Sequence, residues 1–183
     1  MNNDKVSVRK NKIIKKALLK LNEPFSNDYL EEDSTYKAAN FLLENLLENI
    51  LAFGEFYFNL KPEKPSLSTI NDNGKYIYNK PKDYLGIYES NYPIKEIGDC
   101  FYCDYNNLEI IYKQNIDLSD VPLQAENYIV LRLAYELAGT INKTELLNKI
   151  MKEMEYEKIE LESLGAINES DPYSHYNQTR EWY

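Results

Sequence analysis

The residue types that carry most hydrolytic and group-transfer chemistry are scarce in this sequence of 183 residues. Such chemistry usually needs a nucleophile, a base and a group that stabilises charge, and histidine is the commonest base. The single histidine, His175, lies in a polar segment near the C-terminus that shows no periodicity. The sequence contains no GxSxG, HExxH, GxxxxGKS/T or GxGxxG motif. We therefore expect no enzyme activity and assign no catalytic, cofactor-binding or metal-binding residue.

Cys100 and Cys103 form a CxxC pair, which is the one match to a redox or zinc motif. A zinc site of this type needs a second pair of ligands, and the sequence lacks it. The pair falls in a segment that we expect to be a strand, where positions 100 and 103 point to opposite faces and cannot hold a metal together without a turn between them. We interpret both as packing thiols. The alternative, a redox or metal site, requires a thiol of low pKa.

Charge is distributed unevenly along the chain. The net charge is −9, which argues against a nucleic-acid-binding protein because carboxylates repel phosphates. Residues 1–20 hold seven basic residues and one acidic residue, a charge of +6, whereas the rest holds 14 basic and 29 acidic residues, a charge of −15. The sequence has no run of roughly 20 apolar residues, so we expect no membrane span. The N-terminus lacks a secretory signal, so we expect synthesis in a cytoplasm.

The first half of the chain predicts two amphipathic helices. One runs from about Lys10 to Leu21 and ends before Pro24. The second is capped by Asp33 or Ser34 and ends at Gly54. The expected buried stripes are Ile13, Ile14, Ala17, Leu18 and Leu21 in the first helix, and Ala39, Leu42, Leu43, Leu46, Leu47, Ile50 and Phe53 in the second.

Two further helices are predicted after residue 117. Ser119 or Asp120 can cap a central buried helix that includes Tyr128 to Ala138 and ends at Gly139. Within it, Arg132 and Glu136 are four residues apart, and we interpret them as a pair on one helix. Asn142 and Glu145 have the spacing of a capping box for a long last helix that ends near Gly165. Its expected buried stripe is Leu147, Ile150, Met151, Met154, Leu161 and Leu164.

The segment between Lys61 and about Asp117 has a different character. Prolines, an Asn-Gly pair at 73 and 74, and short alternating aromatic and β-branched runs predict strands. The sharpest run is Leu108 to Lys113, and Asn106-Asn107 suggests a turn back to Cys100 to Tyr105. We predict a mainly α, α+β protein: a helical bundle (1–60 and 118–167) with an extended hairpin or small antiparallel sheet inserted at 61–117, and an extended C-terminal tail at 168–183.

The tail carries residue types that are enriched in binding hot spots, although it is too polar and short to build a core of its own. A disordered end and a docking peptide that becomes ordered on a partner are the two alternatives. The candidate docking residues are Tyr173, His175, Tyr176, Arg180, Trp182 and Tyr183.

The order of these features resembles the tail tubular protein A family of short-tailed bacteriophages. The resemblance covers about residues 11–171. The segments that carry it are Leu21-Asn22-Glu23-Pro24, Gly54-Glu55-Phe56-Tyr57-Phe58-Asn59, Ile77-Tyr78-Asn79-Lys80-Pro81-Lys82-Asp83-Tyr84-Leu85 and Leu118-Ser119-Asp120-Val121-Pro122. Phe56 stands where the family commonly has tryptophan.

The resemblance implies a non-enzymatic virion protein of the phage neck, made in the bacterial host cytoplasm. Such proteins form a homo-oligomeric ring, commonly of twelve copies, between the portal protein and the next tail or ring protein. The C-terminal tail would insert into the portal, and DNA would pass through the ring without specific binding. A basic first helix and an acidic body could meet head to tail, which makes Lys12, Lys15 and Lys16 candidate subunit contacts. Arg132 is a further candidate subunit contact, as the weaker alternative to its pairing with Glu136. The alternatives are a DNA-binding accessory factor that uses the basic N-terminal helix, and a neck or head-completion protein of another phage type.

Overall fold

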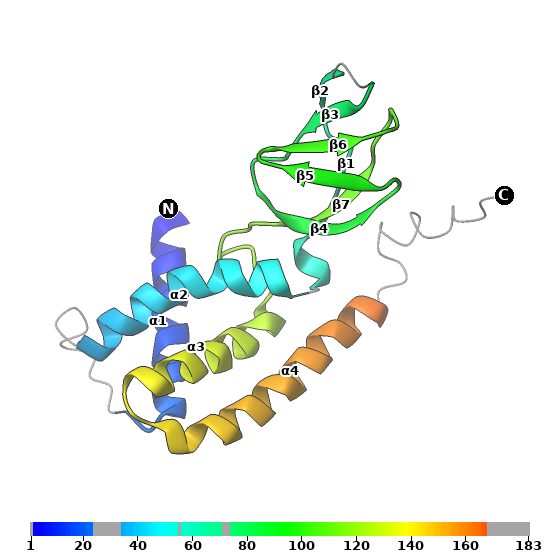
Figure 1. The fold of residues 1–183 in the computed structure, drawn as a ribbon. Helices are drawn as coiled ribbons and strands as arrows, with labels where there is room; N and C mark the ends of the chain where they lie inside the picture. The colour runs from blue at the N-terminus through cyan, green and yellow to red at the C-terminus, as the bar shows by residue number, and fades with distance from the viewer. Residues whose placement is uncertain (1, 24–33, 55, 71–73, 168–183) are drawn as a thin grey trace.

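A helical bundle and a separate β unit make up the computed structural model, which describes residues 2–23, 34–54, 56–70 and 74–167. The β unit stands on one end of the bundle and is inserted between the second and third helices (Figure 1). The predicted α+β class, helical with a small inserted antiparallel region, is therefore confirmed. The helices are α1 (Asn2–Lys20), α2 (Ser34–Phe53), α3 (Glu126–Thr140) and α4 (Leu147–Ile167).

α1 is amphipathic as predicted, but it begins at Asn2 rather than near Lys10. It ends because Asn22 adopts the left-handed conformation, with φ of 55°. This turn lets the amide of Glu23 donate a hydrogen bond to the carbonyl oxygen of Leu18 at 3.1 Å. All five predicted core residues of the helix are at most 1% exposed: Ile13, Ile14, Ala17, Leu18 and Leu21.

α2 buries most of its predicted stripe, with one clear error. Ala39, Leu43 and Ile50 are buried, whereas Phe53 is 83% exposed. Leu51 takes its place in the core and is fully buried. The predicted stripe continued one position too far, to the last residue of the helix, where no neighbouring element in the described part of the chain covers the ring.

The boundaries of α3 differ from the prediction. A short 3-10 turn, η2 (Leu123–Ala125), leads into the helix, and neither Ser119 nor Asp120 provides a side-chain cap. The helix also runs past Gly139. It ends at Thr140, and Asn142 just beyond it adopts a φ of 59°, so that the amide of Lys143 donates a hydrogen bond to the carbonyl oxygen of Ala138 in the last turn.

The start of α4 also differs from the prediction, because of the conformation of Asn142. Because Asn142 ends α3 in the left-handed conformation, it cannot also cap the next helix. A second 3-10 turn, η3 (Thr144–Leu146), has no side-chain cap and leads into α4, so the predicted capping box is wrong. Ile150 and Leu161 are buried as predicted, whereas Met151 is 37% exposed.

The β unit consists of two antiparallel sheets. One has the strand order β1-β7-β4 and the other β2-β3-β6-β5. The predicted turn between residues 100–105 and the Leu108 run does not pair these segments, because β6 and β7 belong to different sheets. The strands are β1 (Leu60–Glu63), β2 (Leu67–Ile70), β3 (Tyr76–Asn79), β4 (Tyr84–Ser90), β5 (Ile94–Ile97), β6 (Cys100–Cys103) and β7 (Ile110–Gln114), and the 3-10 turn η1 (Tyr57–Asn59) precedes β1.

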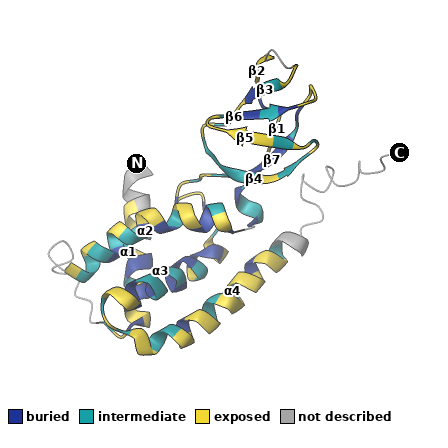
Figure 2. Cartoon of the chain, in the orientation of Figure 1, coloured by how far each residue is buried: buried dark blue, intermediate teal, exposed yellow. Residues whose placement is uncertain are grey.

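Each unit has its own core (Figure 2). In the bundle, α3 packs against each of the other three helices and lies at the centre. In the β unit, Leu108, Ile110 and Tyr112 are at most 1% exposed, which confirms that they share a buried face. Phe101 and Tyr78 complete that core from the other sheet. A large apolar or aromatic side chain that is fully buried contributes roughly 1.5–3 kcal/mol, so each core is a substantial source of stability.

Candidate interaction surfaces

Arg9 of α1 holds the chain where it returns from the β unit to the bundle. One guanidinium nitrogen, Nη1, donates to the carbonyl oxygens of Leu118 and Val121, each at 2.7 Å. The other, Nη2, donates to the carbonyl oxygen of Pro122 at 3.3 Å. The Nε atom lies 3.8 Å from the carboxylate of Glu126. Because a guanidinium presents several donors in one plane, this side chain fixes the return segment at three points.

Glu126 is a buried carboxylate at the start of α3, only 4% exposed. The Nζ atoms of Lys16 and Lys12 lie 2.6 and 2.9 Å from its Oε1 atom. Burial alone would raise the pKa of this carboxyl, but the hydrogen bonds from Lys16 and Lys12 outweigh it and hold the pKa below its usual value. The carboxylate therefore stays ionised and ties α1 to α3.

The four predicted subunit-contact residues already have interactions of their own. Lys12 and Lys16 bind Glu126. Arg132 pairs with the Glu136 carboxylate at 3.0 Å, so the interpretation of these two as a pair on one helix is confirmed. Lys15 is engaged as well. A role for these residues between subunits stays a prediction.

The junction between α2 and β1 is fixed by close packing. A Cβ atom on Gly54 would lie 2.0 Å from the Phe56 ring, so no larger residue fits there. Phe56 is 1% exposed and stacks on Phe58 at 5.3 Å between ring centroids. The side-chain amide of buried Asn59 donates to the carbonyl oxygen of Leu51 at 2.8 Å and thereby caps the last turn of α2.

Asp83 joins the three strands β1, β7 and β4. Its carboxylate accepts hydrogen bonds from the Tyr112 hydroxyl and the Gln114 amide, each at 2.7 Å, and lies 3.5 Å from Lys61 Nζ. Burial alone would raise the pKa of the Asp83 carboxyl, but these donors lower it. Lys113, which lies between Tyr112 and Gln114 on β7, donates a hydrogen bond from its ammonium group to the carbonyl oxygen of Ala52 in α2 at 3.0 Å. This contact links the β unit directly to the bundle.

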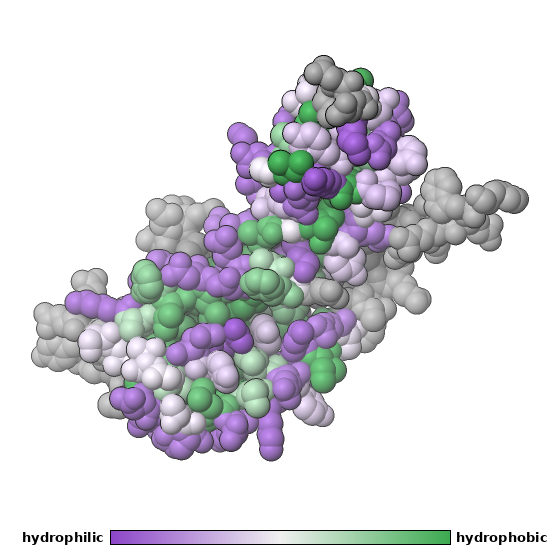
Figure 3. All heavy atoms as spheres, viewed as in Figure 1, coloured by the Kyte–Doolittle hydropathy of each residue, from purple (hydrophilic) through white to green (hydrophobic). Residues whose placement is uncertain are grey.

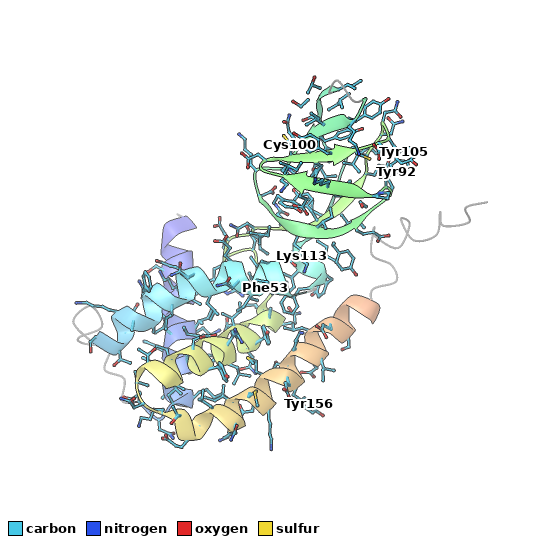
Figure 4. All side chains as sticks on the ribbon, in the orientation of Figure 1. Phe53, Tyr92, Cys100, Tyr105, Lys113 and Tyr156 are labelled. Atoms are coloured by element: carbon cyan, nitrogen blue, oxygen red, sulfur yellow. The ribbon has the colours of Figure 1, made fainter. Side chains whose placement is uncertain are left out.

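Large apolar side chains remain exposed on both units. On α4, Tyr156 and Ile159 are 76% and 66% exposed, and Figure 4 shows Tyr156 pointing away from the bundle. On α2, Phe53 lies at the helix end that faces the β unit (Figure 4). Figure 3 shows apolar side chains gathered on the face of the bundle that is turned to the viewer. Exposed apolar surface of this kind is typical of protein–protein contacts. Phe53 was predicted to be buried, and its position at the end of the helix was the available signal that it is exposed.

A cleft of about 520 Å³ opens at one side of the β unit. Leu67 of β2 and the rings of Tyr76 and Tyr78 line it together with Leu108. The Tyr78 hydroxyl donates to the carbonyl oxygen of Tyr105 at 3.1 Å, so its polar end already has a partner. Polar residues line the rest of the cleft, where the ammonium of Lys64 pairs with the carboxylate of Glu109 beside Asn106 and Asn107.

The two cysteines are free and lie on β6 as expected, with Cys103 buried and Cys100 partly exposed on the opposite face (Figure 4). Among the described residues there is no group of three or more His, Cys, Asp or Glu side chains that could hold a metal ion. No helix in that part of the chain is both long and apolar enough to cross a membrane. The six candidate docking residues (Tyr173, His175, Tyr176, Arg180, Trp182 and Tyr183) lie outside the described residues.

Comparisons of the chain with protein-family models and with curated proteins found no match.

Proposed function

We propose that this chain is a structural connector that assembles head to tail into a ring, like the tail tubular protein A adaptors that join a phage portal to the tail. In this proposal the ring has about a dozen copies, by resemblance. It binds the portal protein on one side and the next ring or tail protein on the other, at the neck of the virion. DNA passes through the ring without specific binding.

The observation that carries the proposal is where the resembling segments lie in the fold. Asn22 ends α1, Gly54 and Phe56 close the junction to the β unit, and Asp83 joins three strands. The segment 118–122 is the one that Arg9 holds. Two of these segments, the one with Gly54 and Phe56 and the one at 118–122, lie where the chain passes between the bundle and the β unit. A likeness that includes both crossing points supports a shared two-unit framework, and a connector needs such a framework to keep its binding faces at a fixed separation.

The distribution of exposed apolar side chains also supports the proposal. A ring subunit in a head-to-tail arrangement needs two different surfaces for its two neighbours. Tyr156 and Ile159 lie on α4, whereas Leu67, Ile70 and Ile97 lie on the β unit. Apolar contacts are thus available on two separate parts of the molecule.

The DNA-binding alternative is weaker because the basic helix is largely neutralised within the chain. Lys10 binds Glu44 and Lys20 binds Glu153, each at 2.6 Å, in addition to the contacts of Lys12 and Lys16 with Glu126. Phosphate binding would require these lysines to leave their carboxylate partners.

The direct test is association with a portal ring. The full chain should be produced with the portal protein encoded in the same genome, and the purified complex imaged by electron microscopy. We expect a second ring stacked coaxially on the portal. Recovery of the portal ring alone under the same conditions would overturn the proposal.

The docking role of the tail can be tested separately. Deletion of residues 172–183 should leave the circular dichroism spectrum unchanged, because the described cores lie entirely before that segment. The same deletion should abolish portal association. A truncated chain that still binds the portal would show that the tail is not the docking element.

A further inference from the structure

The four-stranded sheet has two edges that no described backbone covers. Its order, β2-β3-β6-β5, leaves β2 and β5 with one strand partner each. No other backbone hydrogen bond involves either strand within the described part of the chain. All four residues of β2 are exposed, as Figure 2 shows at the far end of the β unit. An uncovered edge of this kind is a template for pairing with another strand.

The edge at β2 is also open on the side that faces the core. Leu67 and Ile70 lie opposite Tyr78 and Tyr76, and Tyr78 is 3% exposed within the core between the sheets. Leu67 and Ile70 therefore face inward, yet they are 49% and 52% exposed. Leu67 also borders the 520 Å³ cleft. The sheet ends at β2 before its inner face is covered.

The directions of the two edge strands fit each other. Each of the three strand pairs in this sheet is antiparallel, so β2 and β5 run in opposite directions. If a second copy is placed beside the first with its strands aligned, β5 of one copy lies antiparallel to β2 of the other. An even number of alternating strands thus allows the sheet to continue from copy to copy in the favoured antiparallel pattern.

The other sheet lacks this property. Its three strands, β1-β7-β4, alternate in direction, so β1 and β4 run the same way and would pair in parallel between aligned copies. β1 contains Pro62, which has no amide hydrogen to donate. β4 has two irregularities in its register, whereas β2 has one, between Leu67 and Thr69. A proline and repeated irregularities protect an edge against pairing.

The two edge strands can also be aligned so that inward-pointing residues of β2 lie beside inward-pointing residues of β5. Ile94 lies opposite Cys103, which is buried, so Ile94 points inward as Ile70 does, whereas Lys95 points outward. A register that sets Ile70 beside Ile94 of the next copy therefore sets Thr69 beside Lys95, outer face with outer face. β2 has no charged residue, so the pairing brings no like charges together.

We infer that β5 of one copy adds to the edge of β2 in the next copy, so that the four-stranded sheet continues around the ring. The partner of β2 is a second copy of this chain, and the interface is a backbone ladder with Leu67 and Ile70 covered at its inner side. The inference rests on the proposed function for the closure of the ring. The pairing itself concerns the two strands and can be tested on the chain alone.

Cysteine cross-linking tests the pairing. Thr69→Cys and Lys95→Cys are placed in separate chains, each with Cys100→Ser to remove the partly exposed native thiol, while buried Cys103 stays. Within one chain the two positions lie at opposite edges, about 14 Å apart across three strand spacings, so a disulfide between them must join two copies. We expect a covalent dimer when the two variants are mixed and oxidised, and none from either variant alone. A chain that carries both cysteines should give a ladder of covalent oligomers.

The controls decide between this pairing and its rivals. A covalent dimer from Thr69→Cys alone would show β2 pairing with itself, and one from Lys95→Cys alone would show β5 pairing with itself; either result overturns the inference. Lys149→Cys, exposed at the start of α4, replaces Lys95→Cys as the matched control and should give no dimer with Thr69→Cys. Adding Ile70→Lys places a charge on the inner side of the β2 edge, and this variant should no longer form the covalent dimer or the covalent oligomers.

The failures of the two proposals can be told apart. If the chain forms a ring on the portal but the mixed variants give no disulfide, the pairing of β2 with β5 is wrong and the connector role stands. If the covalent oligomers form but the chain does not associate with the portal, the pairing of β2 with β5 stands and the connector role is wrong.

Discussion

At the scale of single residues, Glu126 is the buried charge on which the joint between α1 and α3 depends. Glu126→Gln removes the anion shared by Arg9, Lys12 and Lys16, and we expect the free energy of unfolding to fall by about 2–4 kcal/mol in urea denaturation. Glu44→Gln is the matched control, because its carboxylate is 60% exposed where it binds Lys10, and it should cost less than about 1 kcal/mol. Equal losses in the two variants would contradict this account.

Glu126 should also make the stability of the protein depend on pH in the acid range. Because the partners of Glu126 hold the pKa of its carboxyl below the usual value, the folded state binds this proton less readily than the unfolded state. The contribution of Glu126 is therefore present above an unfolded-state pKa of about 4.3 and is lost as the pH falls through the lower folded-state pKa. The stability difference between wild type and Glu126→Gln should shrink over that acid range. A constant difference would show that the carboxylate charge is not what stabilises the joint.

Two glycines provide a matched test of close packing. Gly54→Ala would place a Cβ atom 2.0 Å from the Phe56 ring and 2.8 Å from the carbonyl oxygen of Ile50, so we expect a loss of about 2–3 kcal/mol. Gly139 lies within α3, but a Cβ atom added there would have no neighbour within 4 Å, and Gly139→Ala should stabilise by about 0.5–1 kcal/mol. Thermal denaturation of both variants measures the difference. A neutral Gly54→Ala variant would show that the junction can relax.

Residue-scale predictions from the sequence succeeded where a pattern was local. Gly54 was correctly placed at the end of α2, but the reason is the space that Phe56 needs, which depends on a fold that the sequence pattern does not show. Glu126 was not singled out among 30 acidic residues, because nothing local distinguishes a carboxylate that three distant cations will surround. Arg9 was counted as one more positive charge and not as the group that holds the return segment.

At the scale of elements, the Asp83 network predicts how the sheet β1-β7-β4 responds to alkali. Burial and the hydrogen bond to Asp83 raise the pKa of Tyr112 to about 12. A raised pKa stabilises the fold below the unfolded value of about 10, and this contribution is lost as the pH rises from there towards 12. Tyr112→Phe should be less stable at neutral pH by about 1–2 kcal/mol, and it should lose less stability between pH 10 and 12 than wild type.

Circular dichroism of the two proteins across this alkaline range measures the effect. Tyr88→Phe is the control, because Tyr88 is 45% exposed on β4 and should show the wild-type dependence on pH. Parallel curves for wild type and Tyr112→Phe would contradict the role given to the network.

Hydrophobic periodicity predicted the four α-helices of the described residues and the strand character of the inserted region, since each depends on neighbours along the chain. The pairing of strands was harder to predict from the sequence. β6 and β7 follow each other closely, which suggested a hairpin, yet Asn107 adopts a φ of 63° and the chain crosses from one sheet to the other. The predicted caps of the last two helices were wrong for a related reason. Asn142 fits either the end of one helix or the start of the next, and only the positions of α3 and α4 decide between them.

At the scale of the whole molecule, two units of different character are held at a fixed relation by a few joints. Lys113 reaches from β7 to the end of α2, and Arg9 reaches from α1 to the segment that leaves the β unit. The order of helices and strands along the chain predicted a helical bundle with a small antiparallel region inserted in it. The open edges of the four-stranded sheet could not be predicted, because they follow from which strands pair and not from the composition of any strand.

The measurement that tests the connector role most directly is the mass and symmetry of the assembly formed on a portal ring. Native mass spectrometry and electron microscopy of the purified complex should give a single copy number and a closed ring that shares the axis of the portal. A portal that carries no copies of this chain, or scattered copies without rotational symmetry, would contradict the account.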